Sequence, residues 1–374
     1  MDYEQLNEKT LIVTREPLAG TSLSNLLRLL VQNRFNIDGR YVPRILYATT
    51  VSSLLTPLRL KEIVQFDKAI KKTEIPHHPL FILGHWRSGT TYLHNLLSRD
   101  DFLGYFSTFH VVLPHLFLGN KALIKSFTAS SLPIKRPMDD VPMGPEFPQE
   151  DEFALAAVSP YSGNHGLCFP RNVAYYNRFI FMDDVPQQIK DEWKERYRYL
   201  IQKETLYRKG KRLVLKNPAN TARAQLLLEM FPEAKFIHIY RNPYHVYLSM
   251  MKLLLNIVPF MCVQKPPNIA EVEQRVLQVY KRMYMKYLEE KTAIPKENLV
   301  EVRYEEFIRH PHEQLNHIYT ALHLHGFKES EKKFSEYIAS QEHVKKQKYF
   351  LDELVKEKIY EEWKFAFTAF HYKK

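Results

Sequence analysis

Cysteine is nearly absent from this sequence of 374 residues: only Cys168 and Cys262 occur, and there is no Cys-x-x-Cys pair. Two distant cysteines exclude a disulfide framework, so a reducing compartment is expected. The sequence also lacks an Asn-x-Ser/Thr glycosylation site, and its start, Met-Asp-Tyr-Glu, has neither the basic nor the apolar region of a signal peptide. These absences favour a cytoplasmic protein.

Long apolar runs are missing as well. Residues 102–120 carry no Asp, Glu, Lys or Arg, and they approach the ~20 residues that a membrane-spanning helix needs. The stretch nevertheless contains His110, Pro114 and His115, which argue against a transmembrane helix. We therefore expect a soluble protein in which this stretch is buried or lines a binding site.

Acidic residues are outnumbered by basic ones, 42 to 53, which gives a net charge of +11. Nucleic acid, an acidic membrane surface or a polyanionic small ligand would each suit this balance. The basic residues are spread along the chain without a long run, which is atypical of a nucleic-acid-binding stripe. We expect a pocket for an anion and no nucleic-acid partner, while peripheral contact with a membrane and the oligomeric state stay open.

Strand-like runs alternate with helical patterns in the middle of the chain. Short apolar runs predict strands at 80–83, 212–215, 235–240 and 299–302. Helical periodicity fills the intervals, 221–231 among them, and also residues 1–76 and the C-terminus. This alternation predicts an α/β fold with a parallel sheet flanked by helices. We expect an added helical segment, 1–76, packed on a core domain of 77–374.

Glycine is scarce, with 11 residues, yet Gly84 and Gly89 frame four residues directly after the first predicted strand. The segment Gly84-x-x-x-x-Gly89-Thr90-Thr91 has the spacing of a nucleotide-binding P-loop, with Thr90 where that loop has lysine. Backbone amides of such a loop and of the helix after it bind phosphate oxygens. Because the lysine would contact the β- and γ-phosphates, its loss disfavours a triphosphate, and Arg87 suits a shorter anion. The sheet is therefore expected to be P-loop-like.

A second candidate phosphate site follows the strand 235–240. Arg241 comes directly after that strand, and Asn242-Pro243 is typical of a helix N-cap followed by its first residue. Ser249 lies about two helical turns further on. A guanidinium and a hydroxyl in this arrangement can hold one phosphate from two sides.

Together these segments resemble the donor-binding motifs of sulfotransferases that use 3′-phosphoadenosine 5′-phosphosulfate (PAPS). The glycine-framed loop resembles their 5′-phosphosulfate motif, and Arg241 with Ser249 resembles their 3′-phosphate motif. Leu215-Lys216-Asn217-Pro218 is similar to a segment that supplies a catalytic lysine in tyrosylprotein sulfotransferases. The segment around Tyr304 resembles one that packs near the 3′-phosphate and the adenine of the donor.

The likeness is closest to the bacterial-type and tyrosylprotein branches, through Arg87-Ser88-Gly89-Thr90-Thr91. The C-terminal Gly-x-x-Gly-x-x-Lys segment of cytosolic aryl and steroid sulfotransferases is absent. The resemblance implies in-line, metal-independent transfer of a sulfuryl group from PAPS to a hydroxyl or an amine. It does not imply specificity for small phenols or steroids.

The resemblance also implies roles for individual side chains. Arg87 and Lys216 would stabilise charge on the bridging and sulfuryl oxygens, while Ser88, Gly89, Thr90 and Thr91 would hold the 5′-phosphate. A general base must accept the proton of the acceptor. Glu150 or Glu152 is expected in this role, although acids there also suit the start of a helix. His110 and His165 are weaker candidates.

Alternatives remain for the substrates. The loop spacing alone is compatible with an ATP-dependent small-molecule kinase, which the missing lysine opposes. Paired histidines such as His310-x-His312 lack the spacing of metal ligands on a helix face, so no metal site is expected. A small molecule, a carbohydrate, a lipid headgroup or a protein tyrosine could each be the acceptor. Its binding site is expected within 102–120, 139–152 and 161–171.

Overall fold

The computed structural model describes residues 12–131, 143–341 and 351–374. The chain forms two compact units, which we call the helical unit and the sheet unit. The helical unit comprises Met1–Ile75, Phe106–Gly210 and Leu253–Ile269. The sheet unit comprises Pro76–Tyr105, Lys211–Lys252 and Ala270–Lys374. One boundary between units thus falls beside the domain boundary expected after residue 76, and the assignment of 77–374 to a single domain stays a prediction.

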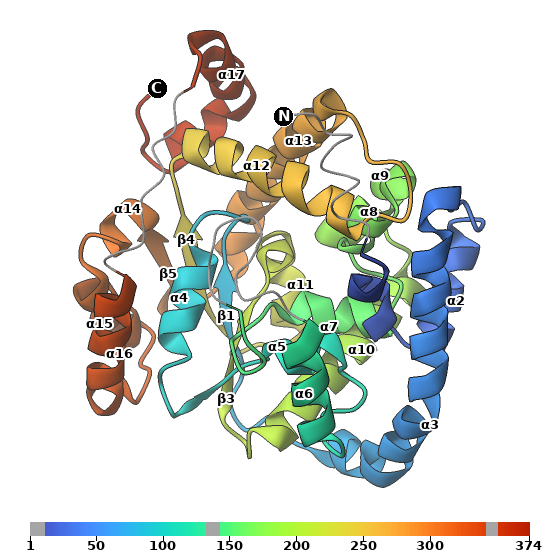
Figure 1. Cartoon of the computed structure of the whole chain (residues 1–374). Coiled ribbons are helices and arrows are strands. Elements are labelled where there is room, and N and C mark those ends of the chain that lie inside the picture. Colours follow the sequence, from blue (N-terminus) through green and yellow to red (C-terminus); the bar gives the residue numbers. More distant parts are fainter. Residues whose placement is uncertain (1–11, 132–142, 342–350) are drawn as a thin grey trace. The chain divides into compact units, whose positions relative to one another are not determined.

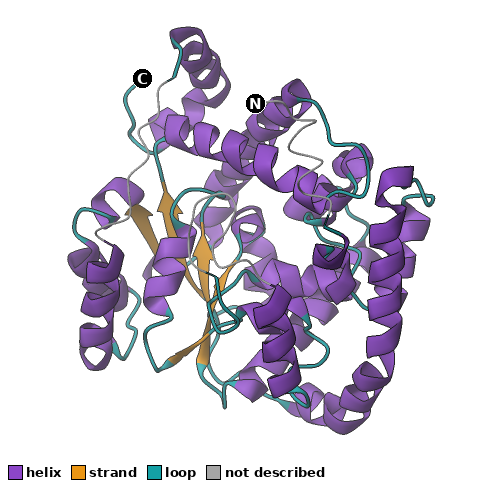
Figure 2. Ribbon diagram, in the orientation of Figure 1, coloured by secondary structure: helices purple, strands orange, loops and turns teal. Residues whose placement is uncertain are grey.

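A parallel sheet of five strands forms the centre of the sheet unit (Figure 2). Its strands are β1 Leu80–Leu83, β2 Leu103–Gly104, β3 Arg212–Lys216, β4 Lys235–Tyr240 and β5 Leu299–Arg303, in the order β2-β3-β1-β4-β5. The four predicted strands are confirmed to within one residue at each end. The fifth, β2, has only two residues, too few to produce an apolar pattern in the sequence.

Helices surround this sheet (Figure 1). They are α4 Thr90–Leu97, α11 Ala224–Met230, α13 Ile269–Glu290, α14 Tyr304–Phe307, α15 Pro311–Ala321, α16 Phe327–Gln341 and α17 Glu353–Ala369, while α12 Pro243–Met261 contributes to both units. Leucines of α4 pack with the apolar side chains of β1 and β4 in a buried core. Every residue of β1 is buried, as expected for a strand covered on both faces.

The helix expected over 221–231 begins later than predicted. A 3₁₀ turn occupies Pro218–Ala222, and α11 starts at Ala224. The side chain of Asn217 accepts a hydrogen bond from the amide of Ala219 at 3.0 Å, which fixes this turn before the α-helix can begin.

The helical unit contains the predicted N-terminal helices, α2 Leu23–Gln32 and α3 Val42–Lys72. Its other helices are α5 Thr108–Val112, α6 Lys121–Ser131, α7 Asp151–Val158, α8 His165–Cys168, α9 Val173–Phe181 and α10 Gln187–Tyr207. The stretch 102–120 supplies a buried cluster that includes Phe109, Leu116 and Phe117, so most of it serves the core. Residues 139–142 of the expected acceptor-binding stretch lie outside the described residues.

Candidate functional site

The loop after β1 requires glycine at both ends. Gly84 has a φ of 141°, and a Cβ atom there would lie 2.3 Å from the carbonyl oxygen of Ile239 on β4. Gly89 has a φ of 102°, and a Cβ atom there would lie 2.3 Å from the Cδ2 atom of Tyr304. Any other residue would be both strained and in collision with its neighbour. The spacing seen in the sequence therefore reflects close approach of β4 and Tyr304 to the loop.

Hydrogen bonds fix the loop between the two glycines. The hydroxyl of Ser88 donates to the carbonyl of His85 at 2.7 Å, and the amide of Gly84 donates to the hydroxyl of Thr221 at 2.7 Å. Arg87 has a φ of 72°, a conformation that is uncommon outside glycine and concentrates at functional sites. The loop is thus held in a shape that carries Arg87 in a strained conformation.

Arg87 joins the two sites that the sequence treats as separate. Its Nε donates to the hydroxyl of Ser249 on α12 at 2.8 Å. The Nη1 atom of Arg241 donates to the carbonyl oxygen of Arg87 at 3.1 Å. The predicted 5′- and 3′-phosphate sites are therefore neighbours within the sheet unit.

Tyr304 completes this cluster. The guanidinium carbon of Arg241 lies 4.4 Å from the centre of the Tyr304 ring, a cation–π contact that orients the arginine. The Nε atom of Arg241 is buried and has no hydrogen-bond partner among the described residues. A buried N–H of a charged group is costly to leave unpaired, so it is available for an anionic ligand.

The predicted start of α12 is confirmed, and its support was not foreseen. The Asn242 side chain accepts from the amide of Tyr244 at 3.0 Å, as an N-cap does. The amide of Asn242 itself donates to one oxygen of Glu305 at 3.0 Å, and the hydroxyl of Tyr372 donates to the other at 2.6 Å. Glu305 follows Tyr304 in the segment that resembles a donor-binding segment of sulfotransferases. The sequence around Tyr372 contains no pattern that predicts its contact with Glu305.

Lys216 lies at the end of β3, and Thr90 and Thr91 lie at the start of α4. Lys216 ends β3 and is buried. Burial, and secondly the charge of Lys216, hold the pKa of His94 on α4 well below its usual value, which places the ammonium group close to α4. Thr90 and Thr91 open α4, and the preceding Gly89 has no side chain that could cap the helix. The first amides of α4 are therefore suited to an anion.

The expected general bases lie in the helical unit, at the start of α7. Glu152 is buried and accepts a hydrogen bond from the Ser162 hydroxyl at 2.7 Å. Asp151, also buried, accepts from the Tyr197 hydroxyl at 2.6 Å, and burial raises its pKa to about 6. Glu150 precedes the helix and is only half-buried. The first-turn acids Asp151 and Glu152 thus fit the interpretation as a charged helix start, and Glu150 is the accessible carboxylate.

His110 and His165 are core histidines. Nδ1 of His110 lies 2.9 Å from a carboxylate oxygen of Glu204 in a fully buried pair, and burial lowers the pKa of the imidazole. Nε2 of His165 lies 3.0 Å from the carbonyl oxygen of Ser159, and burial lowers its pKa to about 4. Neither arrangement suggests a proton acceptor for a substrate.

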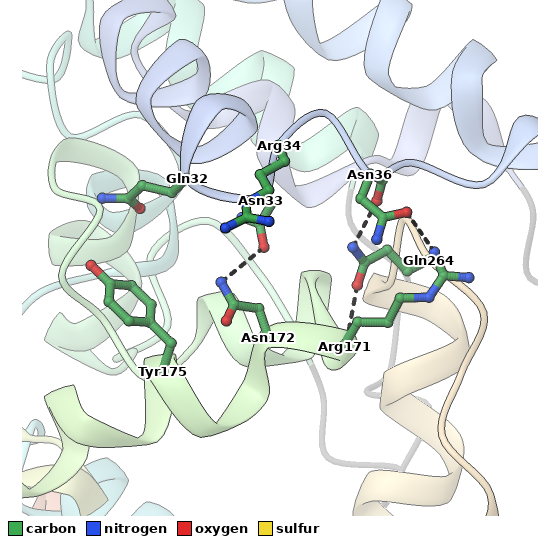
Figure 3. Close-up of a pocket in the computed structure, with 8 residues that line it drawn as sticks. All are labelled: Gln32, Asn33, Arg34, Asn36, Arg171, Asn172, Tyr175 and Gln264. Carbon is green, nitrogen blue, oxygen red and sulfur yellow. Dashed lines mark hydrogen bonds between the residues drawn. The ribbon is translucent and has the colours of Figure 1, made fainter.

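A polar pocket occupies another part of the helical unit (Figure 3). Its lining is rich in amides and includes Arg171, from the expected acceptor-binding stretch 161–171. These groups largely bond to one another: Gln264 donates to the Asn36 carbonyl at 2.7 Å, and Arg171 donates to the Asn36 side chain at 2.8 Å. None of the predicted donor-site residues lines this pocket.

Neither a metal cluster nor a membrane span emerges from the part of the chain that the structure describes. No group of three or more His, Cys, Asp or Glu side chains there is arranged to hold a metal ion. No helix among those residues is both long and apolar enough to cross a bilayer.

Solved structures with a similar fold include two mycobacterial sulfotransferases. STF1 from Mycobacterium tuberculosis has a TM-score of 0.65 at 17% identity, covering 96% of this chain and 98% of that one. STF9 from Mycobacterium avium has a TM-score of 0.66 at 16% identity, covering 93% of this chain and 96% of that one. At these identities the likeness concerns the fold.

Sequence comparison identifies the family. A relative from Mycobacterium bovis, omega-hydroxy-beta-dihydromenaquinone-9 sulfotransferase Stf3, is 32% identical over 335 residues, which are 89% of this chain and 85% of the relative. The protein of the same name from Mycobacterium tuberculosis gives the same values. Residues 79–329, which hold the whole glycine-framed loop and the Arg241 cluster, match the profile of the Sulfotransferase family. The chain belongs to this family and is a sulfotransferase enzyme.

Proposed function

We propose that this sulfotransferase moves a sulfuryl group from PAPS to a hydroxyl group of a lipid acceptor. The observation that carries the donor half of the proposal is the linked cluster of Arg87, Ser249, Arg241 and Tyr304, which joins two anion sites. Such a pair suits a nucleotide with phosphates on both the 3′ and 5′ sides of its ribose.

Donor binding divides between the two halves of the cluster. The amides of Ser88, Gly89, Thr90 and Thr91 at the start of α4 hold the 5′-phosphate, together with the hydroxyls of the threonines. Arg241 and Ser249 hold the 3′-phosphate, and the buried, unpartnered Nε of Arg241 supports this assignment within the described residues. Tyr304 orients Arg241 and offers its ring to the adenine.

Catalysis by this chain is electrostatic. The sulfuryl group carries a single negative charge, and PAPS when bound supplies it on a good leaving group. Arg87 and Lys216 stabilise the charge that develops on the bridging and sulfuryl oxygens, and the buried position of Lys216 strengthens its effect. Because these cations supply the positive charge, transfer proceeds without a metal ion.

Glu150 is the better of the two proposed general bases. A base must reach a proton that belongs to another molecule. The carboxylate of Glu152 is buried and bonded to Ser162, whereas the side chain of Glu150 is only half-buried. We therefore assign proton acceptance to Glu150 and a supporting role in α7 to Glu152.

The proposed acceptor follows from the relatives. The mycobacterial Stf3 proteins, by their name, act on a hydroxylated dihydromenaquinone, which is a lipid. Identity of 32% over most of both chains supports an acceptor of the same chemical class, a long apolar molecule with a terminal hydroxyl. The kinase alternative loses its support, because the family is established and Thr90 replaces the lysine of nucleotide kinases.

The test is transfer of radiolabelled sulfate from PAPS to defined acceptors in detergent micelles. We expect labelling of a hydroxylated prenyl quinol, and weak or no labelling of a phenol, a tyrosine peptide or an oligosaccharide. Full activity in the presence of a metal chelator is also expected. Labelling confined to a water-soluble acceptor would overturn the lipid assignment, and turnover of ATP with magnesium instead of PAPS would overturn the donor assignment.

A further inference from the structure

Exposed apolar side chains concentrate on the N-terminal part of the helical unit. Ten of the sixteen large hydrophobic residues exposed in the described chain lie within 12–64: Ile12, Leu27, Val31, Phe35, Val42, Leu46, Leu54, Leu60, Ile63 and Val64. Some are almost fully accessible, with Val64 at 88% and Leu54 at 72%. Single exposed hydrophobic residues are normal, but a concentration in one segment indicates a binding surface.

Eight of these ten residues lie on α2 and α3, two helices that pack together (Figure 1). On α2, Leu27 and Val31 are four residues apart, so they share a face, and exposed Phe35 lies in the turn after the helix. On α3, Val42, Leu46, Leu60 and Val64 fall on one side of a helix with 3.6 residues per turn. We call the exposed sides of α2 and α3, from 24 to 72, the apolar face.

The exposed charges around the apolar face are mostly positive. Among the described residues from 12 to 73, seven basic residues are exposed: Arg28, Arg34, Arg40, Lys61, Lys68, Lys71 and Lys72. No Asp or Glu is exposed over the same described residues, but Glu74 directly after them is exposed, and Arg28 pairs with Glu192 at 3.0 Å. Asp38 and Asp67 are half-buried and paired with Arg171 and Lys71 at 2.7 and 2.8 Å, and Glu62 is buried against Lys203.

We propose that the apolar face docks on an anionic lipid bilayer, with its hydrophobic side chains inserted between headgroups. Apolar rows bordered mainly by cations are the pattern of helices that lie in a membrane interface, and each basic residue near an anionic surface adds to binding. A second copy of the chain is the less suitable occupant. In a two-fold interface the same cationic surface would face itself, and like charges in contact oppose association. The inference deepens the proposed function and rests on it in one respect: a lipid acceptor resides in such a bilayer.

Vesicle sedimentation tests the proposal with the full chain. The probes are vesicles of phosphatidylcholine alone and vesicles that also contain phosphatidylglycerol. We expect binding to the anionic vesicles, weaker binding at high salt, and at least tenfold weaker binding to the neutral vesicles. The variant Leu46→Ser/Leu60→Ser/Val64→Ser should bind at least tenfold more weakly than the parent.

A matched control replaces exposed hydrophobic residues outside the apolar face, Leu123→Ser/Met285→Ser/Leu354→Ser, and should bind as the parent does. Thermal stabilisation of both variants by adenosine 3′,5′-bisphosphate verifies that the donor site is folded. No sedimentation of the parent, or equal loss in both variants, would overturn the proposal. A concentration-dependent dimer that only the apolar-face variant loses would assign the surface to a second copy.

The same experiment separates this inference from the proposed function. Sulfation of a short-chain hydroxylated quinol in detergent, without vesicles, depends on the donor and acceptor sites and not on docking. Transfer in detergent without vesicle binding would overturn the docking surface alone. Vesicle binding without transfer to any lipid would overturn the proposed acceptor.

Discussion

Two groups of polar residues differ in their surroundings. The donor cluster of the sheet unit consists of Arg87, Arg241, Ser249 and Tyr304, and the acidic turn of the helical unit consists of Asp151 and Glu152 at the start of α7. In the donor cluster, Arg87, Ser249 and Arg241 bond to one another, and a buried N–H of Arg241 has no partner among the described residues. In the acidic turn, Asp151 and Glu152 are buried and receive hydroxyl donors from their own unit. We propose that the first group is organised toward a ligand, whereas the two acids of the second are held by hydrogen bonds within their own unit.

This difference shows why a motif predicts one site better than the other. A predicted phosphate-binding loop depends on backbone spacing. At Gly84 and Gly89, Ile239 and Tyr304 approach the backbone so closely that a Cβ atom would collide with them. A general base depends only on one carboxylate being accessible, and three neighbouring acids look alike in a sequence. The comparison is tested most directly by replacing the half-buried acid, Glu150, and a buried acid, Glu152, in separate variants.

The largest effect is expected from Glu150→Gln. Loss of a general base should lower kcat by about 10²–10⁴-fold while leaving the Kd for adenosine 3′,5′-bisphosphate unchanged. Glu152→Gln is the matched control. It should lower the melting temperature while leaving kcat nearly unchanged, because the carboxylate of Glu152 accepts a buried hydrogen bond. Steady-state kinetics and thermal unfolding of both variants distinguish a loss of kcat from a loss of stability. The opposite pattern would make Glu152 the base and break the comparison between the two clusters.

Lys216→Met should reduce kcat by about 10²–10³-fold, the cost of removing one preorganised charge from a transition state. The side chain is buried, so stability must be followed separately through the thermal shift with adenosine 3′,5′-bisphosphate. Lys216→Arg, which retains the charge, should recover part of the rate. A rate unchanged in Lys216→Met would remove this residue from the catalytic assignment.

Asp151→Asn tests whether the acidic turn serves the fold. The pKa of Asp151 is raised to about 6 by burial, above its value in an unfolded chain, so the folded state binds more protons between about pH 4 and 6. Its contribution to stability is therefore present at low pH and lost as the pH rises through 6. The variant should gain stability relative to the parent over that range, by up to about 3 kcal/mol. Denaturant unfolding at pH 4, 5, 6 and 7 measures the difference, and a gap independent of pH would contradict the assignment.

Most of the sheet could be predicted from the sequence, because buried parallel strands such as 80–83 and 235–240 are uniformly apolar and end at polar residues. The positions of Arg87 and Arg241 after those strands were predictable for the same reason. The direct contact between Arg87 and Ser249 was not, because it depends on how α12 leaves β4.

Contacts between distant segments were the least predictable. Tyr372 donates to Glu305 across 67 residues of sequence, and no local pattern marks either partner of that bond. The helix expected from residue 221 starts three residues later because Asn217 favours a 3₁₀ turn, a competition between local side chain and backbone that periodicity does not reveal. The apolar face was also unforeseen, since exposure of Leu46 or Val64 depends on which side of α3 the rest of the unit covers.

Arg241→Ala tests the ligand-directed nature of the donor cluster. A hydrogen bond to a charged group contributes about 1.5–3 kcal/mol, so the Kd for adenosine 3′,5′-bisphosphate should rise roughly 10- to 100-fold. Arg309→Ala is the matched control, since Arg309 is exposed and pairs with Glu306 at 3.0 Å. It should leave the Kd unchanged. Calorimetric titration gives both values, and equal affinity in Arg241→Ala and the parent would show that Arg241 does not contact the 3′-phosphate.

The smallest effect concerns Tyr372, which we expect to position the donor site without touching the donor. Its hydroxyl holds Glu305, and Glu305 holds the amide of Asn242, next to Arg241. Tyr372→Phe removes one hydrogen bond of about 0.5–1.5 kcal/mol, so KM for PAPS should rise roughly two- to tenfold while kcat at saturating donor stays constant. Tyr360→Phe, on the same C-terminal segment, should change neither value. A fall in kcat without a change in KM would place Tyr372 outside donor binding, and the extent of the donor cluster would then end at Tyr304.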